Sequence, residues 1–159
     1  MLLIIGKEYC KIDSNGRFKF PVALKRQLDT DDGRFVVRRG LYANCLELWT
    51  YESFKAEVEG LQKRLNPYNR EDVEMFRKLN ESSIVELDSS DRMLIPAEHK
   101  GVLQNSKEIV LQSMGRFIEI WDYDQYQEMN TRTADMMDKV DARLGRGTSI
   151  DAQDDNRIS

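Results

Sequence analysis

Two segments of the sequence place an aspartate four residues before an arginine. Asp13 precedes Arg17, and Asp88 precedes Arg92. An aspartate at the start of a tight turn accepts backbone N–H groups and fixes the reversal of the chain. An arginine that emerges from such a turn can donate two hydrogen bonds to O6 and N7 of guanine, or it can pair with the aspartate itself. These residues therefore predict either two DNA-contacting turns or two structural ion pairs that pin hairpins.

The residues inside both turns suit a tight backbone. Ser14 and Ser89 follow the aspartates, and their hydroxyls can bond the local backbone. Gly16 accepts a positive φ at no steric cost. Asp91 occupies the same position in the second turn, and aspartate tolerates the left-handed conformation less well than glycine but better than most residues. We therefore expect the same turn in both segments.

The two turns belong to an internal repeat. Residues 8–28 read EYCKIDSNGRFKFPVALKRQL and residues 83–103 read SIVELDSSDRMLIPAEHKGVL, with identical residues recurring at an offset of 75. A second pair of blocks, CLELW at 45–49 and FIEIW at 117–121, matches at an offset of 72. Two matching blocks in the same order indicate a duplicated unit, with a loop three residues shorter in the second copy.

Each unit predicts the same order of elements, which places its turn between two strands. Pro21 and Pro96 stand at the expected first position of short helices that run to Leu28 and Leu103. The strands, recognised by alternating or continuous apolar residues, are expected at Tyr9–Ile12, Arg17–Phe20, Phe35–Arg38, Leu46–Trp49, Ile84–Leu87, Arg92–Ile95, Glu108–Gln112 and Ile118–Trp121. Amphipathic helices are expected at 51–65, 69–79, 122–129 and 133–144.

These patterns predict an α+β fold in which two pseudo-symmetric β-α-β repeats form one β-rich domain flanked by helices. Residues 1–65 would be the first repeat with its C-terminal helix, and residues 83–130 would be the second repeat. Residues 66–82 would form a connecting helix and residues 131–144 a C-terminal helix. Residues 145–159 contain too little apolar surface to order themselves, so we expect a disordered tail.

The composition is that of a chain that can bury a core without entering a membrane. Its 159 residues are 40% hydrophobic and 33% charged. The sequence contains no run of about 18 apolar residues, the length that a helix needs to cross a bilayer. We interpret the apolar start MLLII as a first strand rather than a signal peptide, because Lys7 and Glu8 follow at once. A cytoplasmic location with reduced thiols is therefore expected.

The net charge of −4 is unevenly distributed. Residues 1–40 hold nine Lys or Arg and five Asp or Glu, a local charge of +4, whereas residues 83–130 hold four and nine. A local basic patch can provide the electrostatic footprint of nucleic-acid binding. The basic residues near the first turn that could contact phosphates are Lys19, Lys25, Arg26, Arg38 and Arg39.

The duplicated pattern of a turn, an arginine, a strand and a proline resembles the MraZ family of bacterial transcriptional regulators and the wider AbrB-like swapped-hairpin proteins. The resemblance rests on DSNGRFKFP and DSSDRMLIP, on CLELW and FIEIW, and on their spacing, and it covers about residues 1–130. Paired turns in two such units are typical of MraZ, whereas one copy alone would indicate only a swapped hairpin. The chain departs from the family at Asp91, where glycine is usual, and this adds a negative charge to the second turn.

The resemblance implies a fold in which the two repeats interlock their swapped hairpins. It also implies a homo-oligomeric ring that binds double-stranded DNA at short G-rich direct repeats. By this resemblance, the repeats lie in the promoter of the cell-division and cell-wall gene cluster that contains the regulator's own gene. The regulator is expected to repress that promoter at the nucleoid. The implied DNA-contacting residues are Asp13, Arg17, Asp88 and Arg92. Each subunit offers few phosphate contacts, so several subunits on tandem repeats would multiply weak sites by roughly 10²–10⁴.

We expect no enzyme, cofactor, metal or small-molecule substrate. The matching aspartates lack the Asp-Thr/Ser-Gly sequence of aspartic proteases, and the arginines would keep both carboxylates ionised. Cys10, Cys45 and His99 are too few for a zinc site of four such ligands, and we interpret them as packing residues. The alternative function is a non-enzymatic oligomeric scaffold or protein-binding module, whose acidic second repeat would suit a basic partner.

Overall fold

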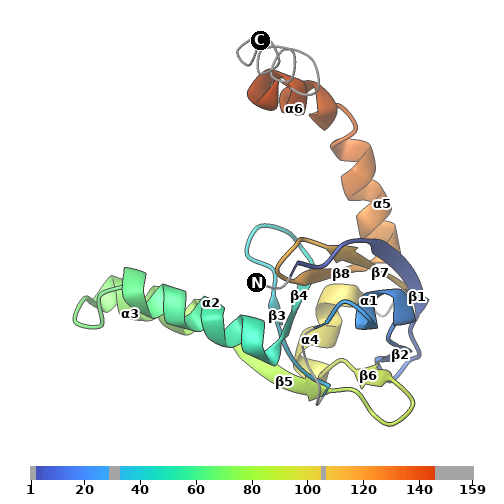
Figure 1. The fold of residues 1–159 in the computed structure, drawn as a ribbon, viewed down its shortest axis with the longest axis horizontal. Coiled ribbons are helices and arrows are strands. Elements are labelled where there is room, and N and C mark those ends of the chain that lie inside the picture. The colour runs from blue at the N-terminus through green and yellow to red at the C-terminus, as the bar shows by residue number, and fades with distance from the viewer. Residues whose placement is uncertain (1–2, 29–32, 105–106, 146–159) are drawn as a thin grey trace, which may run out of the picture. The chain divides into compact units, whose positions relative to one another are not determined.

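The computed structural model describes residues 3–28, 33–104 and 107–145 (Figure 1). The chain divides into two compact units, Met1–Gln125 and Tyr126–Ser159. Both sheets lie in the first unit, and the described residues of the second unit are mainly helical. The tail predicted to be disordered lies outside the described residues from position 146 onward.

The two halves of the chain contain the same strands and α-helices in the same order, and one further helix follows each set. The first half contains β1 (Lys7–Lys11), β2 (Arg17–Lys19), α1 (Val22–Lys25), β3 (Arg34–Arg39), β4 (Leu46–Thr50) and α2 (Tyr51–Arg64). After α3 (Arg70–Leu79), the second half contains β5 (Ser82–Glu86), β6 (Arg92–Leu94), α4 (Ala97–Lys100), β7 (Glu108–Ser113), β8 (Ile118–Asp122), α5 (Tyr123–Arg132) and α6 (Met136–Leu144). The prediction of an α+β fold is confirmed, and every strand predicted for the repeats lies within two residues of its expected bounds.

The apolar N-terminal segment does not form the predicted first strand. Among its described residues only Ile4 makes a β-bridge, to Gly115, and the side chain of Ile4 is buried. Ile5 donates its backbone N–H to the side-chain oxygen of Gln27 at 2.8 Å instead of to a strand. Gly6, with a φ of +126°, then breaks the extended backbone before β1 begins. For the described residues 3–5 the prediction of a strand is therefore wrong, because the local backbone geometry interrupts the ladder; residues 1 and 2 lie outside the described residues.

The short helices begin one residue later than predicted. Pro21 and Pro96 have extended backbones and precede α1 and α4, so each proline is the N-cap rather than the first helical residue. Both helices also end earlier than expected. The chain continues as hydrogen-bonded turns to Leu28 in the first half and as a 3₁₀ turn over Gly101–Leu103 in the second. Tight turns of this kind satisfy the last carbonyl groups of a short helix.

The two halves share one antiparallel sheet of order β1-β7-β8-β4-β3-β5. β1 pairs with β7, β5 pairs with β3, and β4 meets β8 at the centre. A separate ribbon joins β2 to β6. The first strand of each half is therefore bonded to the third strand of the other half, and neither half completes its sheet alone.

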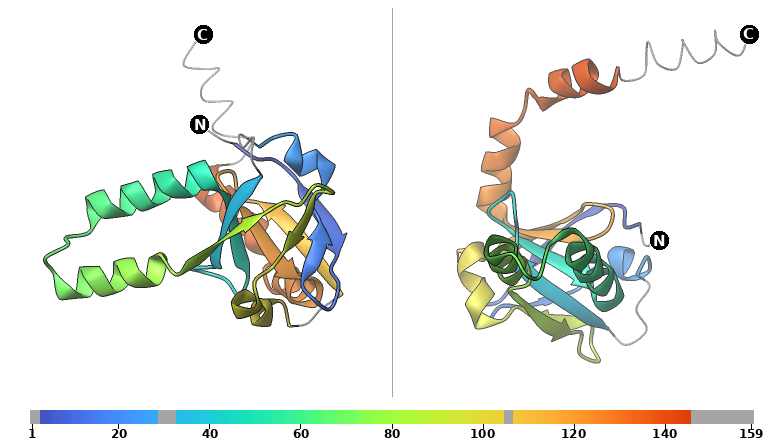
Figure 2. Two further views of the ribbon diagram at one scale, coloured as in Figure 1. Left: turned by 90° about the horizontal axis from the view of Figure 1, so that it is seen from below. Right: turned by 90° about the vertical axis from the view of Figure 1, so that its left-hand side faces the viewer.

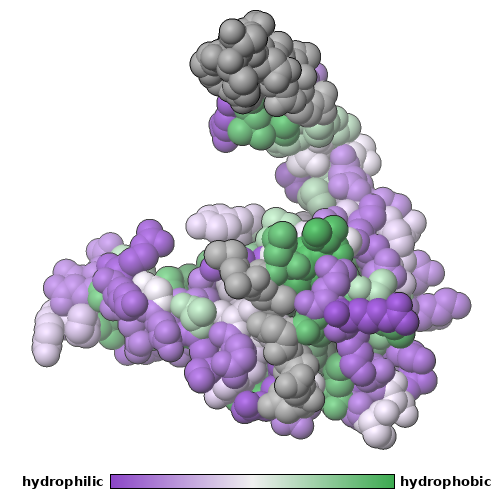
Figure 3. Space-filling view, in the orientation of Figure 1, coloured by the Kyte–Doolittle hydropathy of each residue, from purple (hydrophilic) through white to green (hydrophobic). Residues whose placement is uncertain are grey.

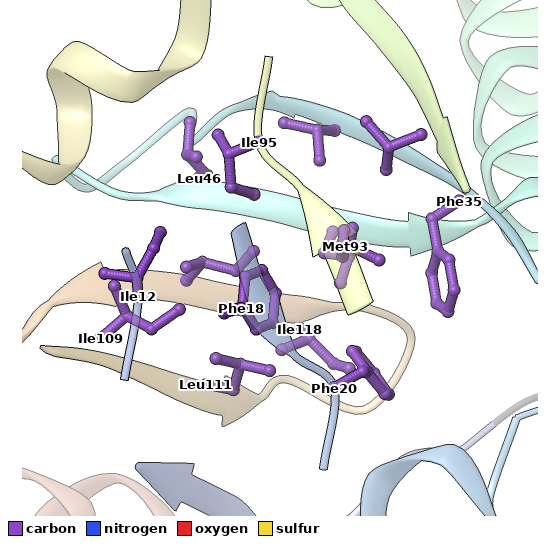
Figure 4. Close-up of a cluster of buried hydrophobic side chains, with 14 of the residues drawn as sticks. Ile12, Phe18, Phe20, Phe35, Leu46, Met93, Ile95, Ile109, Leu111 and Ile118 are labelled. Carbon is purple, nitrogen blue, oxygen red and sulfur yellow. The ribbon is translucent and has the colours of Figure 1, made fainter. Parts of the chain in front are cut away.

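The main core lies between the inner face of this sheet, the β2–β6 ribbon and the short helices. Figure 4 shows Phe18 and Met93 of the ribbon pointing into the cluster, and they are 1% and 0% exposed. Phe20 and Ile95, just beyond the ribbon, are also buried. Full burial of such side chains stabilises a fold by roughly 1.5–3 kcal/mol each, so the core anchors the ribbon that follows both turns.

The outer face of the sheet carries a second cluster that is covered by α2. Trp49 packs edge-on against Phe54 of α2, with ring centroids 5.8 Å apart. The hydroxyl of Thr50 caps α2, and the side chain of Asn69 caps α3. α2 and α3 lie side by side as a helical hairpin (Figure 2), and hydrophilic residues cover most of its visible surface (Figure 3).

Candidate nucleic-acid interface

The two Asp-x-x-x-Arg turns are built by the same hydrogen bonds. Asp13 Oδ1 accepts the backbone N–H groups of Asn15 and Arg17, each at 2.9 Å. Asp88 Oδ1 accepts those of Ser90 at 2.8 Å and Arg92 at 2.9 Å. The backbone N–H of each aspartate donates to the carbonyl oxygen of the arginine and closes the turn, at 3.0 Å for Asp13 and 2.9 Å for Asp88. All of these contacts are local, so four or five residues determine each turn.

The aspartates hold these turns, and the serines do not. Within the part of the chain that the structure describes, the hydroxyl groups of Ser14 and Ser89 make no hydrogen bond. Gly16 has a φ of +88° and Asp91 a φ of +60°, so the residue before each arginine is left-handed. The second turn therefore reproduces the first although it carries an aspartate in place of glycine.

Both aspartates remain ionised well into the acid range. The backbone N–H of Arg17, hydrogen-bonded to the carboxylate, lowers the pKa of Asp13, and the backbone N–H of Arg92 does the same for Asp88. The guanidinium groups of both arginines lower both values further. Each carboxylate therefore interacts electrostatically with the arginines of both turns. The two aspartates and the two arginines form one electrostatic cluster.

The β2–β6 ribbon brings the turns together (Figure 1). Its register sets Lys19 opposite Arg92 and Arg17 opposite Leu94. Side chains alternate across a strand, so these four residues share the exposed face while Phe18 and its partner enter the core. Two further backbone bonds of 2.8 Å join each turn to the strand end of the other repeat, from Phe20 N–H to Asp91 O and from Ile95 N–H to Gly16 O.

The guanidinium groups of Arg17 and Arg92 are available to a ligand. Both residues are exposed, and among the described residues neither side chain makes a hydrogen bond or an ion pair. The aspartates bind the backbone of the arginines rather than their side chains. The structural ion pairs considered from the sequence are therefore not formed.

The other basic residues have different environments. Lys19 lies on the exposed face of the ribbon, and Arg26 is exposed at the end of α1. Lys25 Nζ forms an ion pair of 2.7 Å with Asp91 Oδ1 of the other repeat. Its counterpart Lys100, which the sequence analysis did not single out, donates to the carbonyl oxygen of Ser14 at 2.9 Å.

The suggestion that Arg38 contacts phosphate is wrong. Its side chain is 2% exposed and donates to Glu47 and Glu57 at 2.9 Å and to the carbonyl oxygen of Leu79 at 2.8 Å. Glu47 stands directly opposite Arg38 on the neighbouring strand, and buried charges require such partners. Arg39 points to the other face of β3 and is exposed.

The remaining candidate groups do not form a catalytic or metal site. Ser83 Oγ lies 3.1 Å from His99 Nε2, and Glu98 approaches the same nitrogen at 3.7 Å. Within the described part of the chain no carboxylate is bonded to the opposite ring nitrogen in the way that a catalytic triad requires. Burial raises the pKa of the Cys10 thiol to about 11 and raises that of Cys45 as well. Among the described residues no cluster of three potential metal ligands occurs, and no helix is long and apolar enough to cross a membrane.

Comparison with known proteins identifies a consistent set of relatives. A family model described as MraZ protein matches residues 79–147. The chain is 37% identical to the transcriptional regulator MraZ of Christiangramia forsetii, over 91% of this chain and 95% of that protein. Proteins of the same name from Cytophaga hutchinsonii and Mycoplasmoides gallisepticum are 36% and 34% identical. These matches cover 77% and 87% of this chain, and 82% and 94% of the relatives.

Proposed function

Because this chain belongs to the MraZ family of transcriptional regulators, we propose that it binds double-stranded DNA sequence-specifically through its paired turns and represses transcription. MraZ transcriptional regulators are not enzymes, in agreement with the expectation from the sequence. The observation that carries the proposal is the juxtaposition of Arg17 and Arg92 on one ribbon, both exposed and neither engaged in a hydrogen bond or ion pair within the described residues.

The geometry of the turns suits recognition of guanine. Arg17 and Arg92 follow turns whose backbone is fixed by hydrogen bonds, so the backbone does not have to be ordered when their side chains bind. Each arginine can donate two hydrogen bonds to O6 and N7 of a guanine, which discriminates against other bases by roughly 1–3 kcal/mol. Lys19 and Arg26 are suited to phosphate contacts, which position the protein without reading sequence. Asp13 and Asp88 hold the turns rather than contact the bases.

We further propose that the two halves form interlocked swapped hairpins. The exchange of β1 and β5 between the halves and the ribbon between β2 and β6 support this interpretation. The exchange also favours treating residues 1–65 and 83–130 as the two repeats, joined by the segment 66–82. Such an arrangement fixes the separation of the two arginines, because the turns cannot move apart without breaking the ribbon.

The operator would consist of short direct repeats read by a homo-oligomeric ring. The two terminal strands of the sheet offer complementary exposed side chains for contact between copies. β1 presents Lys7, Tyr9 and Lys11, with Tyr9 56% exposed, and β5 presents Ile84, 60% exposed, and Glu86. Antiparallel contact between these edges would pair opposite charges and apolar groups, and such a head-to-tail contact can close into a ring. Light scattering that gives a stable monomer at micromolar concentration would exclude the ring.

The proposed target is the promoter of the protein's own cell-division and cell-wall gene cluster, reached in the cytoplasm at the nucleoid. Fluorescence anisotropy tests this proposal with a duplex from upstream of the gene and with a scrambled duplex, at several salt concentrations. We expect the native duplex to bind more tightly. Arg17→Ala and Arg92→Ala should each weaken that binding by roughly 5- to 150-fold, the range for loss of a bidentate base contact.

Arg77→Ala provides the matched control, because Arg77 is an exposed arginine on the helical hairpin rather than on the ribbon. It should leave affinity unchanged, and all three variants should keep the circular dichroism and oligomeric state of the wild type. Equal binding of both duplexes without any fall of affinity with salt would exclude DNA recognition. A scaffold or protein-binding function, which the acidic second repeat would suit, would then be the better explanation.

A further inference from the structure

We propose that Lys25 is a positioning residue that neutralises Asp91 and thereby allows the second turn to present Arg92 to DNA. This inference rests on the proposed function and changes the role expected for Lys25, which the sequence suggested as a phosphate contact. It concerns the one position at which the two turns differ in charge, Gly16 in the first and Asp91 in the second.

The acidic group lies where it would oppose DNA binding. Asp91 immediately precedes Arg92, and its left-handed backbone, with a φ of +60°, places it inside the tight turn. Its carbonyl oxygen accepts the N–H of Phe20 at 2.8 Å, so the residue is fixed to the first repeat. An unpaired carboxylate at this position would repel the phosphates that approach the adjacent arginine.

Lys25 supplies the compensating charge from the other repeat. Its Nζ lies 2.7 Å from Asp91 Oδ1, although 66 residues separate the two positions in the sequence. The side chain of Asp91 is 30% exposed and that of Lys25 is 47% exposed, so the pair sits at the surface beside the turn. A phosphate that captured this ammonium group would have to separate it from Asp91 and leave the carboxylate uncompensated.

The first turn provides an internal comparison. Lys100 is the counterpart of Lys25, and it crosses in the opposite direction to the carbonyl oxygen of Ser14, at 2.9 Å. Among the described residues Lys100 forms no ion pair there, and a Cβ added at Gly16 would lie 3.1 Å from its Cδ. Both lysines thus close over the turn of the other repeat, but only Lys25 cancels a charge there.

The surroundings of the second turn make this compensation important. In the repeat, Lys11 corresponds to Glu86 and Lys19 corresponds to Leu94, so the second turn has fewer basic neighbours of its own. The cation opposite Arg92 in the ribbon is Lys19 of the first repeat. Without the Lys25 pair, the local charge of Arg92 would be offset by the adjacent carboxylate.

A double-mutant cycle distinguishes charge compensation from direct phosphate contact. The four proteins are the wild type, Lys25→Ala, Asp91→Asn and the double variant, and asparagine is chosen because it tolerates the left-handed backbone. We expect Lys25→Ala to weaken binding of the native duplex about three- to fivefold in the wild-type background, the upper part of the range for exposed charge pairs. In the Asp91→Asn background the same change should have an effect of less than about twofold. The dependence of affinity on salt should keep its slope.

A different pattern would overturn the proposal. If Lys25 contacts phosphate, Lys25→Ala will weaken binding equally in both backgrounds and lower the logarithmic salt slope by about 0.9. If Lys25→Ala has no effect in the wild-type background, Asp91 needs no compensation. Lys100→Ala serves as the matched control. Any change in DNA affinity that it causes should be the same in the wild-type and the Asp91→Asn backgrounds.

The same measurements separate this inference from the function on which it rests. Absence of salt-dependent, sequence-preferring binding by the wild type would exclude both. Normal binding by the wild type without coupling between positions 25 and 91 would exclude only the role of Lys25. Circular dichroism of each variant ensures that the comparison is made among folded proteins.

Discussion

Replacement of Gly16 by alanine should destabilise the protein more than the addition of a single methyl group suggests. Gly16 has a φ of +88°, in the left-handed region that L residues rarely adopt. A Cβ at this position would lie 3.1 Å from Lys100 Cδ and 3.2 Å from the carbonyl oxygen of Ile95. The lysine side chain can move aside, but the carbonyl belongs to the strand end that is bonded to Gly16 itself.

Two contributions set the magnitude. Holding an alanine in the left-handed conformation costs roughly 1–2 kcal/mol. Displacement of Ile95 would also weaken its hydrogen bond to the Gly16 carbonyl, 2.8 Å long, at a cost of about 0.5–1.5 kcal/mol. Together these effects predict a loss of about 1.5–3.5 kcal/mol in the free energy of unfolding. For a chain of this size that corresponds to a fall in melting temperature of roughly 3–14 °C.

Gly60 provides a control in the same chain. It lies inside α2, and a Cβ added there would meet no atom within 4 Å. Gly60→Ala should therefore stabilise the protein by about 0.5–1 kcal/mol, because alanine loses less conformational freedom in a helix. Urea denaturation followed by circular dichroism measures both changes. The reasoning fails if Gly16→Ala unfolds at the same urea concentration as the wild type, or if both variants shift in the same direction.

Three further predictions concern ionisable groups. Arg38→Ala should lower the free energy of unfolding in urea by roughly 3–5 kcal/mol, because it leaves the buried carboxylate of Glu47 without its ion-pair partner. Arg39→Ala should change that free energy by less than about 0.5 kcal/mol, and equal effects of the two substitutions would contradict the burial of Arg38. The lowered pKa of Asp13 means that its stabilisation is present above its ordinary pKa of 3.8 and is lost as the pH falls through the lowered value. Asp13→Asn should therefore destabilise less at pH ~2 than at pH ~7, and a constant difference would refute this sign. Burial raises the pKa of Cys10 and Cys45, so both thiols should react with Ellman's reagent at pH ~8 far more slowly in the folded protein than in urea. Rapid reaction of either thiol in the folded protein would contradict this prediction.

The sequence alone determined the features that arise from short-range interactions. Sequence patterns were sufficient to predict the duplicated units, the order of their strands and helices, and the conformation of each turn. The bonds from Asp13 to the N–H groups of Asn15 and Arg17 span at most four residues. The caps by Asn69 and Asp122 likewise involve residues three positions apart. Local geometry of this kind depends on residue types at fixed spacing, so the pattern was sufficient.

Tertiary structure decided which distant groups meet. Periodicity predicts the face that a strand buries, but it does not predict the strand beside it, and so the pairing of β1 with β7 was not visible in the pattern. The sequence suggested that Arg38 is an exposed cation, whereas in the sheet it lies opposite Glu47 and forms a buried ion pair with it. Lys25 meets Asp91 across 66 residues, and Lys100 meets Ser14 across 86. Contacts over such separations form only after the chain has folded, because the folded backbone, and not local preference, sets the distance between these groups.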